Sequence, residues 1–337
     1  MTITAVVVCY DEDLEELRTA IDGLLAQTRA PTEILLVENG AGAQLASELG
    51  EYPPQVRVVS PGSNLGYTGG VNFGAAHASG DYLVCLNPDA HPEAECLARL
   101  AAVADSDPEV ALVGAQILLE DGVTRNAGDN PLHPTGISPA GGYGEGREAG
   151  EPRDVAVASG ACCLMRRETF LSLGGFIDEL FLYYDDVDLA WRARIAGMRV
   201  VYCPEAVVTH GYEFSRRGRK WFYLERNRLF SVLANYEART LLLLAPLLLA
   251  TELGLLVVAA REGWLSQKLA SYGSLLRLRR RLRAQRRAVQ GSRRCADTEL
   301  LALVDDHLDS ALLSQGSAAL ANAFCVPYMR LVRRLLR

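Results

Sequence analysis

The sequence predicts an α/β protein in which a mostly parallel sheet is flanked by helices and is followed by a C-terminal helical region. Through the first half of the chain, short apolar runs alternate with segments of helical spacing, which is typical of βαβ units. The first run, Ile3–Cys9, is apolar apart from Thr4, as expected of a buried parallel strand. Beyond Trp221 this alternation ends, and long apolar and basic stretches predict helices instead.

The individual elements are expected where the residue pattern changes period. Strands are predicted at Ile3–Cys9, 33–37, Val56–Val59, 81–86, Val110–Leu118, 155–165 and 200–203. Helices are predicted at 14–27, 44–49, 70–78, 93–104 and 168–173. Between them, residues 122–153 are rich in glycine and proline, and we expect a long mobile loop near the functional site.

Composition and charge divide the chain into two unlike parts. Apolar residues make up 49% and charged residues 22%, as in a folded protein with a sizeable core. Residues 216–337 contain 22 Lys and Arg against 9 Asp and Glu, whereas residues 1–215 contain 12 against 32. We therefore expect a domain at 1–220 and a basic, helical region at 221–337.

The cysteines and the N-terminus indicate a reducing compartment. The eight cysteines form no CxxC pair and are scattered through apolar runs, so we expect small buried side chains, not a disulfide framework or a zinc site. The chain enters its first strand directly, without a signal peptide, which predicts a cytoplasmic location for this part.

Polar residues follow four predicted strands at the point where each strand ends. They are Tyr10 and Asp11, Glu38, the stretch SNLGYTGGVNFG at 63–74, and Asn87 with Asp89. Each alone fits ordinary turn chemistry, but ligands of open α/β sheets lie at the carboxyl ends of the strands. The stretch 63–74 matches neither the dinucleotide fingerprint nor the P-loop, yet a glycine-rich turn into a helix suits a phosphate.

Residues 183–195, YYDDVDLAWRARI, place three carboxylates just before a segment of helical spacing. Crowding of like charges raises carboxyl pKa values, and a helix N-terminus relieves part of that crowding. From the residues alone, Asp185 and Asp186 fit either a catalytic base with its neighbour or an acidic N-cap.

Five stretches, in order, resemble the inverting family 2 glycosyltransferases with a GT-A fold, in the bacterial rhamnosyltransferase-like branch. They are CYDEDLEELRTAIDGLLAQT, EILLVENG, NLGYTGGVNFGAAHASGDYLVCLNPDA, ASGACCLMRRETFLSLGGFIDELFLYYDDVDLAWRARIAGM and VVTHGYEFS. The resemblance implies transfer of L-rhamnose from dTDP-L-rhamnose onto a polyprenol-linked or polymeric glycan of the cell envelope. The alternatives are a galactofuranosyl- or other hexosyltransferase using a UDP- or GDP-sugar, and a non-catalytic module that binds nucleotide sugars or nucleic acid.

The resemblance also assigns roles to matching residues. It implies Asp186 as the catalytic base with Asp185 beside it, and Asp89 as a ligand of Mg²⁺ or Mn²⁺; His210 is either a second metal ligand or structural. It implies nucleotide-sugar contacts by Tyr10, Asp11, Glu38, Asn64, Gly69, Gly70, Asn72 and Asn87. Two positions depart from the family pattern, since Asn87 replaces the first Asp of the DxD motif and Glu38 replaces an Asp.

The C-terminal third leaves several interpretations open. Residues 241–260 contain one charge, Glu252, and one proline, Pro246, and fit a membrane span of about 30 Å, a core helix or a subunit interface. Residues 277–294 carry nine arginines and no acid, which suits an anionic membrane surface better than nucleic acid. Residues 328–337 are expected to form an interfacial helix with arginines on one face and leucines on the other. We expect peripheral attachment to the inner face of the cell membrane, and the sequence leaves a homo-oligomer open.

Overall fold

The structure is a computed structural model that describes residues 1–40, 44–211, 219–308 and 315–336. It forms two compact units. The first consists of Met1–Asn130, Ala140–Ala193 and Met198–Phe214, and the second of Pro131–Pro139, Arg194–Gly197 and Ser215–Arg337. This division differs from the predicted boundary at residue 220 because two short internal stretches join the second unit.

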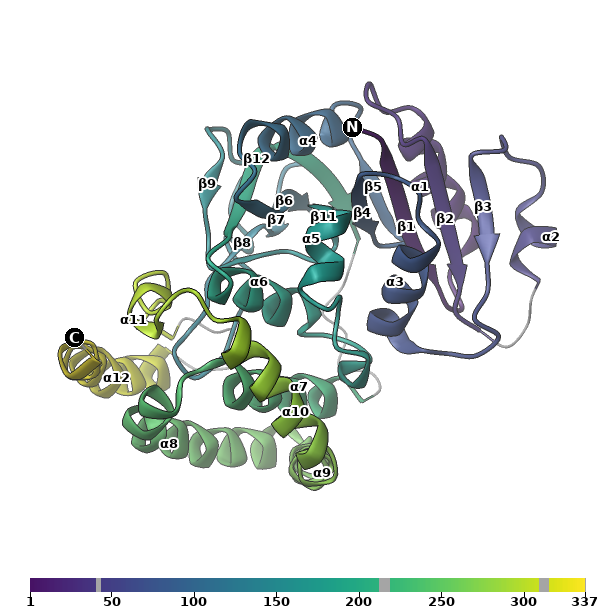
Figure 1. Ribbon diagram of the computed structural model, residues 1–337. Helices are drawn as coiled ribbons and strands as arrows, with labels where there is room; N and C mark the ends of the chain where they lie inside the picture. The colour runs from purple at the N-terminus through teal and green to yellow at the C-terminus, as the bar shows by residue number, and fades with distance from the viewer. Residues whose placement is uncertain (41–43, 212–218, 309–314, 337) are drawn as a thin grey trace. The chain divides into compact units, whose positions relative to one another are not determined.

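The first unit is built on one large mixed sheet (Figure 1). Within the described residues its order is β3-β2-β1-β4-β11-β6-β12-β5, with β7 beside β6 and β9 beside β12. The strands are β1 Ile3–Cys9, β2 Glu33–Glu38, β3 Val56–Val59, β4 Tyr82–Leu86, β5 Ala90–Pro92, β6 Val110–Leu118, β7 Arg125–Ala127, β9 Arg153–Asp154, β11 Cys162–Arg166 and β12 Arg199–His210. Strands β1 to β4 pair in parallel, as do β6 and β12, while β11 runs antiparallel between β4 and β6. The predicted α/β class with a mostly parallel sheet is confirmed.

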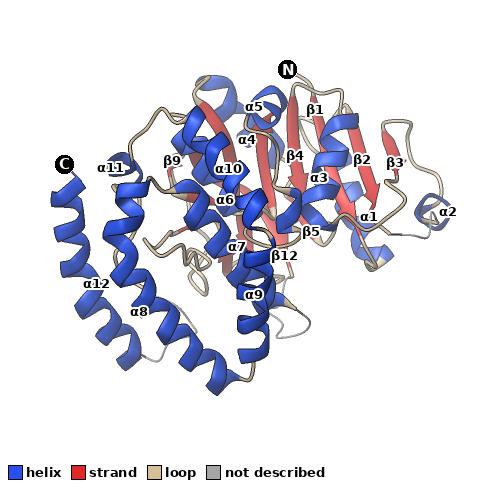
Figure 2. Cartoon of the chain, turned by 60° about the horizontal axis from the view of Figure 1, so that its bottom comes forward, coloured by secondary structure: helices blue, strands red, loops and turns tan. Residues whose placement is uncertain are grey.

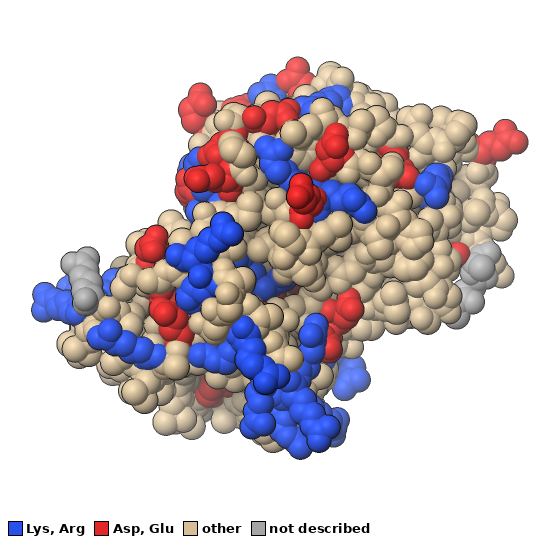
Figure 3. Space-filling model, viewed as in Figure 1, with Lys and Arg blue, Asp and Glu red and all other residues tan. Residues whose placement is uncertain are grey.

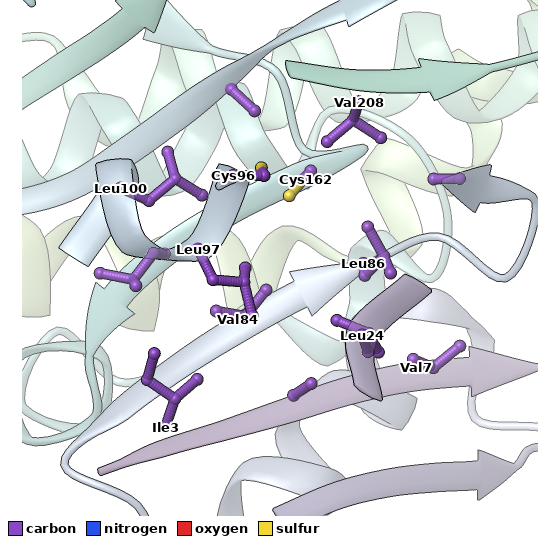
Figure 4. Packing of buried hydrophobic residues seen from close by; sticks show 14 of the residues in the cluster. Ile3, Val7, Leu24, Val84, Leu86, Cys96, Leu97, Leu100, Cys162 and Val208 are labelled. Carbon is purple, nitrogen blue, oxygen red and sulfur yellow. The ribbon is translucent and has the colours of Figure 1, made fainter. Parts of the chain in front are cut away.

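Helices cover both faces of this sheet because the residues of its strands alternate between them. The helices of the first unit are α1 Leu14–Leu25, α2 Leu45–Leu49, α3 Gly66–His77, α4 Cys96–Ser106, α5 Arg167–Ser172 and α6 Asp185–Ile195, with a 3₁₀ turn η1 at Asp178–Leu180. On β1, Ile3 and Val7 lie in the same buried cluster as Leu24 of α1 and Leu97 of α4 (Figure 4). The β1 residues Val6 and Val8 face α3 on the other side of the sheet.

Helix α3 approaches the sheet closely because glycines face it. A Cβ added to Gly70 would lie 2.7 Å from Cγ1 of Val8, and one added to Gly74 would lie 2.5 Å from Cγ1 of Val6. Both distances are shorter than side-chain carbons adopt, so larger residues would push α3 away from β1. The glycine-rich stretch therefore owes part of its composition to packing.

Two sequence-based predictions about the middle of the chain are wrong. Residues 155–165 are not one strand: β10, Val157–Ala158, pairs with β8, Asp129–Asn130, and β11 begins only at Cys162. The interval 122–153 is not one continuous loop, since it contains the short strands β7 and β8. Arg125, which is buried, forms ion pairs with Glu145 and Glu148. Buried charge pairing organises this segment, and hydrophobic periodicity cannot reveal it.

The second unit is helical (Figure 2). Its helices are α7 Lys220–Asn235, α8 Ala238–Glu262, α9 Leu265–Arg277, α10 Arg279–Ser292, α11 Asp297–Leu300 and α12 Gln315–Leu336. Helix α7 packs on α9 and α10, and α8 packs on α9 and α12. A small apolar cluster, in which Trp221 stacks on Trp264 at 4.7 Å between ring centroids, joins α7 to the C-terminal end of α8. The predicted helical C-terminal region is confirmed.

Candidate active site

The strand-end residues singled out in the sequence meet at one edge of the sheet. Tyr10 and Asp11 follow β1, Glu38 ends β2, Asn87 follows β4, and His210 ends β12. Strands β1, β2, β4 and β12 run in the same direction, so their carboxyl ends lie at the same edge. This is where an open α/β sheet binds ligands.

Asp89 and His210 are brought into contact by strand pairing. Strand β5 runs antiparallel to β12, with Ala90 opposite His210. The ring of His210 donates from Nε2 to Oδ1 of Asp89 across 3.0 Å, and the amide nitrogen of Asn87 lies 3.4 Å from the same ring nitrogen. Burial acts to raise the pKa of Asp89, but the hydrogen bond and charge of His210 outweigh it and lower that pKa. Asp89 is therefore held as a carboxylate.

The donor set at this point fits a divalent cation that is shared with a ligand. The carboxylate of Asp89 is the kind of oxygen ligand that Mn²⁺ or Mg²⁺ prefers, and the side-chain amide of Asn87 could add its oxygen by turning over. His210 could join them only by giving up the proton that it donates to Asp89. Asp89 keeps 38% of its side chain exposed. In the described part of the chain, no three His, Cys, Asp or Glu side chains group closely enough to hold a metal by themselves. A cation here would need further oxygen ligands, such as those of a diphosphate.

The paired carboxyls lie at the start of α6 and are tied to the same sheet edge. Oδ2 of Asp186 accepts the backbone N–H of Gly160 at 3.0 Å, and its Oδ1 accepts that of Val187 at 2.8 Å. Gly160 lies just before β11. The next residue, Ala161, accepts a hydrogen bond at its carbonyl from the backbone N–H of Asn87. The third acid of the cluster is structural, because Asp188 is fully buried and pairs with Arg192 at 2.7 Å.

The two carboxyls of the pair differ in their surroundings. Burial, and then the charge of Asp186, raise the pKa of Asp185 well above its ordinary range. Burial also raises the pKa of Asp186, but the N–H groups of Gly160 and Val187 oppose that rise. The pKa of Asp185 is raised to about 8, so this carboxyl holds its proton near neutral pH, whereas the N–H groups of Gly160 and Val187 favour the ionised form of Asp186.

Backbone strain is concentrated around this edge. Among the described residues, four non-glycine residues have φ in the left-handed region: Asp11 at 60°, Phe181 at 64°, Tyr183 at 64° and Tyr184 at 70°. Aromatic residues rarely adopt this conformation, which costs about 1–3 kcal/mol each. Three of these four residues, Phe181, Tyr183 and Tyr184, come directly before the paired carboxyls. The strained backbone therefore lies in the segment that enters α6.

The remaining predicted nucleotide-sugar residues have structural contacts of their own. Oε1 of Glu38 accepts the N–H groups of Gln44 and Leu45 at 2.6 and 2.9 Å, and Oδ1 of Asn64 accepts that of Gly66 at 2.8 Å. Asn72 donates to the carbonyl of Phe176 and to Asp178, and accepts from the N–H of Phe176. Gly69 and Gly70 lie against Leu65 and Val8. Tyr10 is 58% exposed and open to a ligand. The nucleotide-sugar role of these residues stays a prediction.

Two residues at this edge were not singled out from the sequence. Burial, with the charges of Asp89 and Asp11 adding to it, raises the pKa of Glu12, which places this carboxyl in the same electrostatic neighbourhood. The hydroxyl of Tyr67 lies 3.4 Å from the carbonyl of Gly160, next to the paired carboxyls. Glu12 follows the end of β1 by three residues, one more than Asp11, so the strand-end argument could have included it. Tyr67 comes from α3, and only the tertiary structure brings it here.

The raised pKa of Asp185 predicts a pH-dependent stability. Below the ordinary carboxyl pKa, folded and unfolded chains are both protonated there, and Asp185 costs nothing. As pH rises, the unfolded carboxyl ionises freely while the buried one resists, so stability is lost up to the folded pKa. We expect Asp185→Asn to raise the free energy of unfolding, and with it the Tm, more at pH 8 than at pH 5. The difference between the two pH values should be on the order of 1–3 kcal/mol. Thermal unfolding of both proteins without ligand or metal measures this, with Asp22→Asn on the exposed side of α1 as the matched control. An equal change at both pH values would contradict the assignment.

Solved structures share the fold of this chain. One is GalNAc-T7 with UDP, GalNAc and Mn²⁺, with a TM-score of 0.57, 16% identity, and coverage of 71% of this chain and 48% of that one. Another is the mannosyltransferase PcManGT from Pyrobaculum calidifontis in complex with GDP-Man and Mn²⁺, with a TM-score of 0.51, 19% identity, and coverage of 96% and 87%. At these identities the likeness concerns the fold alone, and it confirms the GT-A-type fold.

The chain belongs to glycosyl transferase family 2, whose domain matches residues 4–174. It is 32% identical over 224 residues to the O-antigen biosynthesis protein RfbC of Myxococcus xanthus, covering 63% of this chain but only 18% of that protein. It is 30% identical over 207 residues to the N-acetylglucosaminyl-diphospho-decaprenol L-rhamnosyltransferase of Mycobacterium tuberculosis, covering 54% of this chain and 67% of that one. It is 25% identical over 202 residues to the O-antigen chain rhamnosyltransferase WbaN of Salmonella anatum.

Proposed function

We propose that this protein is an inverting glycosyltransferase that moves L-rhamnose from dTDP-L-rhamnose onto a polyprenol-linked or polymeric glycan of the cell envelope. The observation that carries the reaction type is the meeting of two functional pairs at one sheet edge. Asp89 with His210 suits a cation-bound diphosphate, and Asp186, hydrogen-bonded to Gly160, suits a base. The sugar and the acceptor are supported by the names of the rhamnosyltransferase relatives in Mycobacterium and Salmonella.

The proposed reaction is one displacement at the anomeric carbon. Asp186 takes the proton of the acceptor hydroxyl as its oxygen bonds to that carbon, while the bond to the nucleoside diphosphate breaks on the opposite face. Asp185, holding its own proton, keeps a second negative charge away from the reacting hydroxyl. Asp89 and His210 would hold Mn²⁺ or Mg²⁺, which would supply positive charge for the leaving diphosphate. Tyr10, with its exposed ring, and Asp11 would contact the nucleoside.

This proposal places the enzyme at the inner face of the cell membrane, because a polyprenol-linked acceptor is anchored in lipid. The basic balance of the second unit supports that location. A galactofuranosyl- or other hexosyl transfer from a UDP- or GDP-sugar is the alternative, since Glu38 stands where an Asp is usual.

A screen of donors by thermal shift tests the proposal. We expect dTDP-L-rhamnose with Mn²⁺ to raise the Tm most, because at equal concentrations the ligand with the lowest Kd stabilises the native state most. A ligand at 100 times its Kd stabilises it by about 2.7 kcal/mol. The screen compares this donor with UDP-galactose, UDP-galactofuranose and GDP-mannose, each with and without Mn²⁺. The control is Asp89→Ala, which should lose the Mn²⁺-dependent part of the Tm shift. A larger shift with a UDP- or GDP-sugar would overturn the choice of donor. No shift with any nucleotide sugar would overturn the proposed function itself.

A further inference from the structure

Helix α8 turns its one interior charge toward the protein. Between Arg239 and Arg261 it carries only Glu252, whose Oε2 accepts Nζ of Lys268 at 2.7 Å and the hydroxyl of Tyr272 at 2.6 Å. Arg228 pairs with the same carboxylate, and Lys268 has no exposed surface. Removing one partner of such a cluster would leave a charge unpaired inside the protein, which is strongly destabilising. The cluster therefore fixes which face of α8 points inward.

The face of α8 opposite its buried residues Leu244, Leu247 and Leu255 is apolar and exposed. Its large side chains are Leu242 at 75% exposure, Leu249 at 62%, Leu253 at 57% and Val257 at 52%; these four residues are called the outer stripe. Their spacing of seven, four and four residues aligns them along one side of the helix. Smaller exposed residues on α8, Ala245, Ala250 and Gly254 among them, add no polar group. This is the reverse of a surface helix in water, which buries its apolar face and exposes its charges.

Helix α12 extends this apolar surface. The hydroxyl of Tyr328 donates to the carbonyl of Leu243 at 2.7 Å, so α12 lies beside α8, as Figure 2 also shows. Leu331 and Leu335 are half-exposed next to exposed Arg330 and Arg334. The helical period of 3.6 places Arg330, Arg333 and Arg334 on one side and the leucines on the other, as predicted. The structure differs in exposure, since Arg333 turns inward to Asp306 while Leu331 and Leu335 remain exposed. Residue 337 lies outside the described residues.

The arginines of 277–294 divide into two groups. Arg286 donates to the carbonyls of Leu233 and Tyr236 at 2.6 Å, and Arg293 to that of Asn235, so these two cap the C-terminal end of α7. The others on α10 face outward, and Figure 3 shows basic side chains gathered there. The exposed arginines of α10 are Arg279, Arg280, Arg281, Arg283 and Arg287. The same helical unit thus presents an exposed apolar surface and a cationic one.

We propose that the outer stripe and the exposed face of α12 dock on an anionic lipid surface, with α8 lying along the interface and the exposed arginines of α10 meeting lipid headgroups. The charge of α10 favours lipid over a second copy of this chain, which would bring like charges together. Among the described residues, α8 is the one helix long and apolar enough to span a bilayer, but spanning requires lipid on all sides. Its inner face is committed to the ion cluster and to the tryptophan pair of α7 and α9, so α8 lies in the membrane surface without crossing it.

Flotation with vesicles tests the surface without donor or acceptor, so its result is independent of the proposed sugar transfer. We expect the full chain to float with vesicles of phosphatidylglycerol and phosphatidylcholine, and less with phosphatidylcholine alone. Leu249→Asp with Leu253→Asp should lower partitioning at least about tenfold, because two apolar side chains that lipid would bury are replaced by charged ones. Val123→Asp, equally exposed in the first unit, is the matched control. Circular dichroism confirms that each variant is folded.

A charge variant and a depth measurement complete the test. The triple variant Arg280→Gln, Arg283→Gln and Arg287→Gln should weaken binding about tenfold to hundredfold at low salt and less at high salt, where the charges are screened. The single variants Leu242→Trp, Leu249→Trp and Val257→Trp should show equal quenching of the added tryptophan fluorescence by lipid brominated near the headgroup, after the wild-type signal is subtracted. Deep quenching at Leu249 with shallow quenching at the ends would indicate a span and overturn the proposal.

Three other results would also overturn it. One is no flotation with either vesicle. The second is a wild-type chain that is oligomeric in vesicle-free solution and an outer-stripe variant that is monomeric there but floats with vesicles as the wild type does. The third is a wild-type chain that binds duplex DNA or RNA but not vesicles, together with an arginine variant that no longer binds the nucleic acid.

Discussion

Replacing Asp186 with Asn is expected to lower kcat by about 10²–10⁴-fold, the usual contribution of a general base. The amide keeps the shape of the carboxylate and a hydrogen bond to the N–H of Gly160, but it cannot take the acceptor's proton. Donor affinity should change little, because Asp186 is not among the proposed contacts to the nucleoside diphosphate. Steady-state transfer and donor binding by thermal shift measure the two effects separately.

The neighbouring carboxyl provides the decisive comparison for this prediction. Asp185→Asn leaves the hydrogen bonds of Asp186 in place and should retain more turnover than Asp186→Asn, and Asp22→Asn on α1 should behave as wild type. Near-normal turnover of Asp186→Asn, with loss in Asp185→Asn, would move the base to Asp185. Near-normal turnover in both would remove the paired carboxyls from the reaction.

The second large effect is expected at Asp89. Asp89→Ala should remove the Mn²⁺-dependent part of donor binding and, with it, turnover by at least about 10²-fold, since a cation on the leaving diphosphate contributes several kcal/mol. The variant also leaves His210 without its acceptor at 3.0 Å. Calorimetric titration of Mn²⁺ with dTDP, compared between wild type and variant, reads this out without turnover.

Two controls separate the metal from structural damage at this position. EDTA should reproduce the loss in the wild type, and added Mn²⁺ should restore it. Asp89→Asn, which keeps an oxygen ligand without its charge, should weaken binding less than Asp89→Ala. Donor binding that ignores both EDTA and the substitution would show that the diphosphate is neutralised by basic side chains and not by a cation.

Much of the first unit follows from the sequence because its strands are buried on both faces. A strand such as Ile3–Cys9, with no charged residue to place in water, has few alternatives to the interior of a parallel sheet. The strand ends follow in turn, since parallel strands share one carboxyl edge. This is why Tyr10, Asp11, Glu38, Asn87 and Asp89 could be grouped from the residue pattern alone.

Antiparallel pairings were beyond that reasoning. Nothing in residues 155–165 says that β11 inserts between β4 and β6 against the direction of its neighbours, yet this insertion brings Gly160 to the edge where it donates to Asp186. The pairing of β5 with β12 likewise brings His210 to Asp89 across 121 positions of sequence. Such contacts depend on which strands become neighbours, and local periodicity carries no information on that.

The sequence by itself determined that residues 241–260 are apolar, that Glu252 interrupts them and that arginines follow. Only the tertiary structure decided which way this helix faces. Because Lys268, Arg228 and Tyr272 surround Glu252, the charged position turns inward and the leucines of the outer stripe turn out. An apolar helix has the same sequence whether its leucines meet protein or lipid, and the buried residues of α8, with the ion pairs of Glu252 beside them, are what distinguish the two faces.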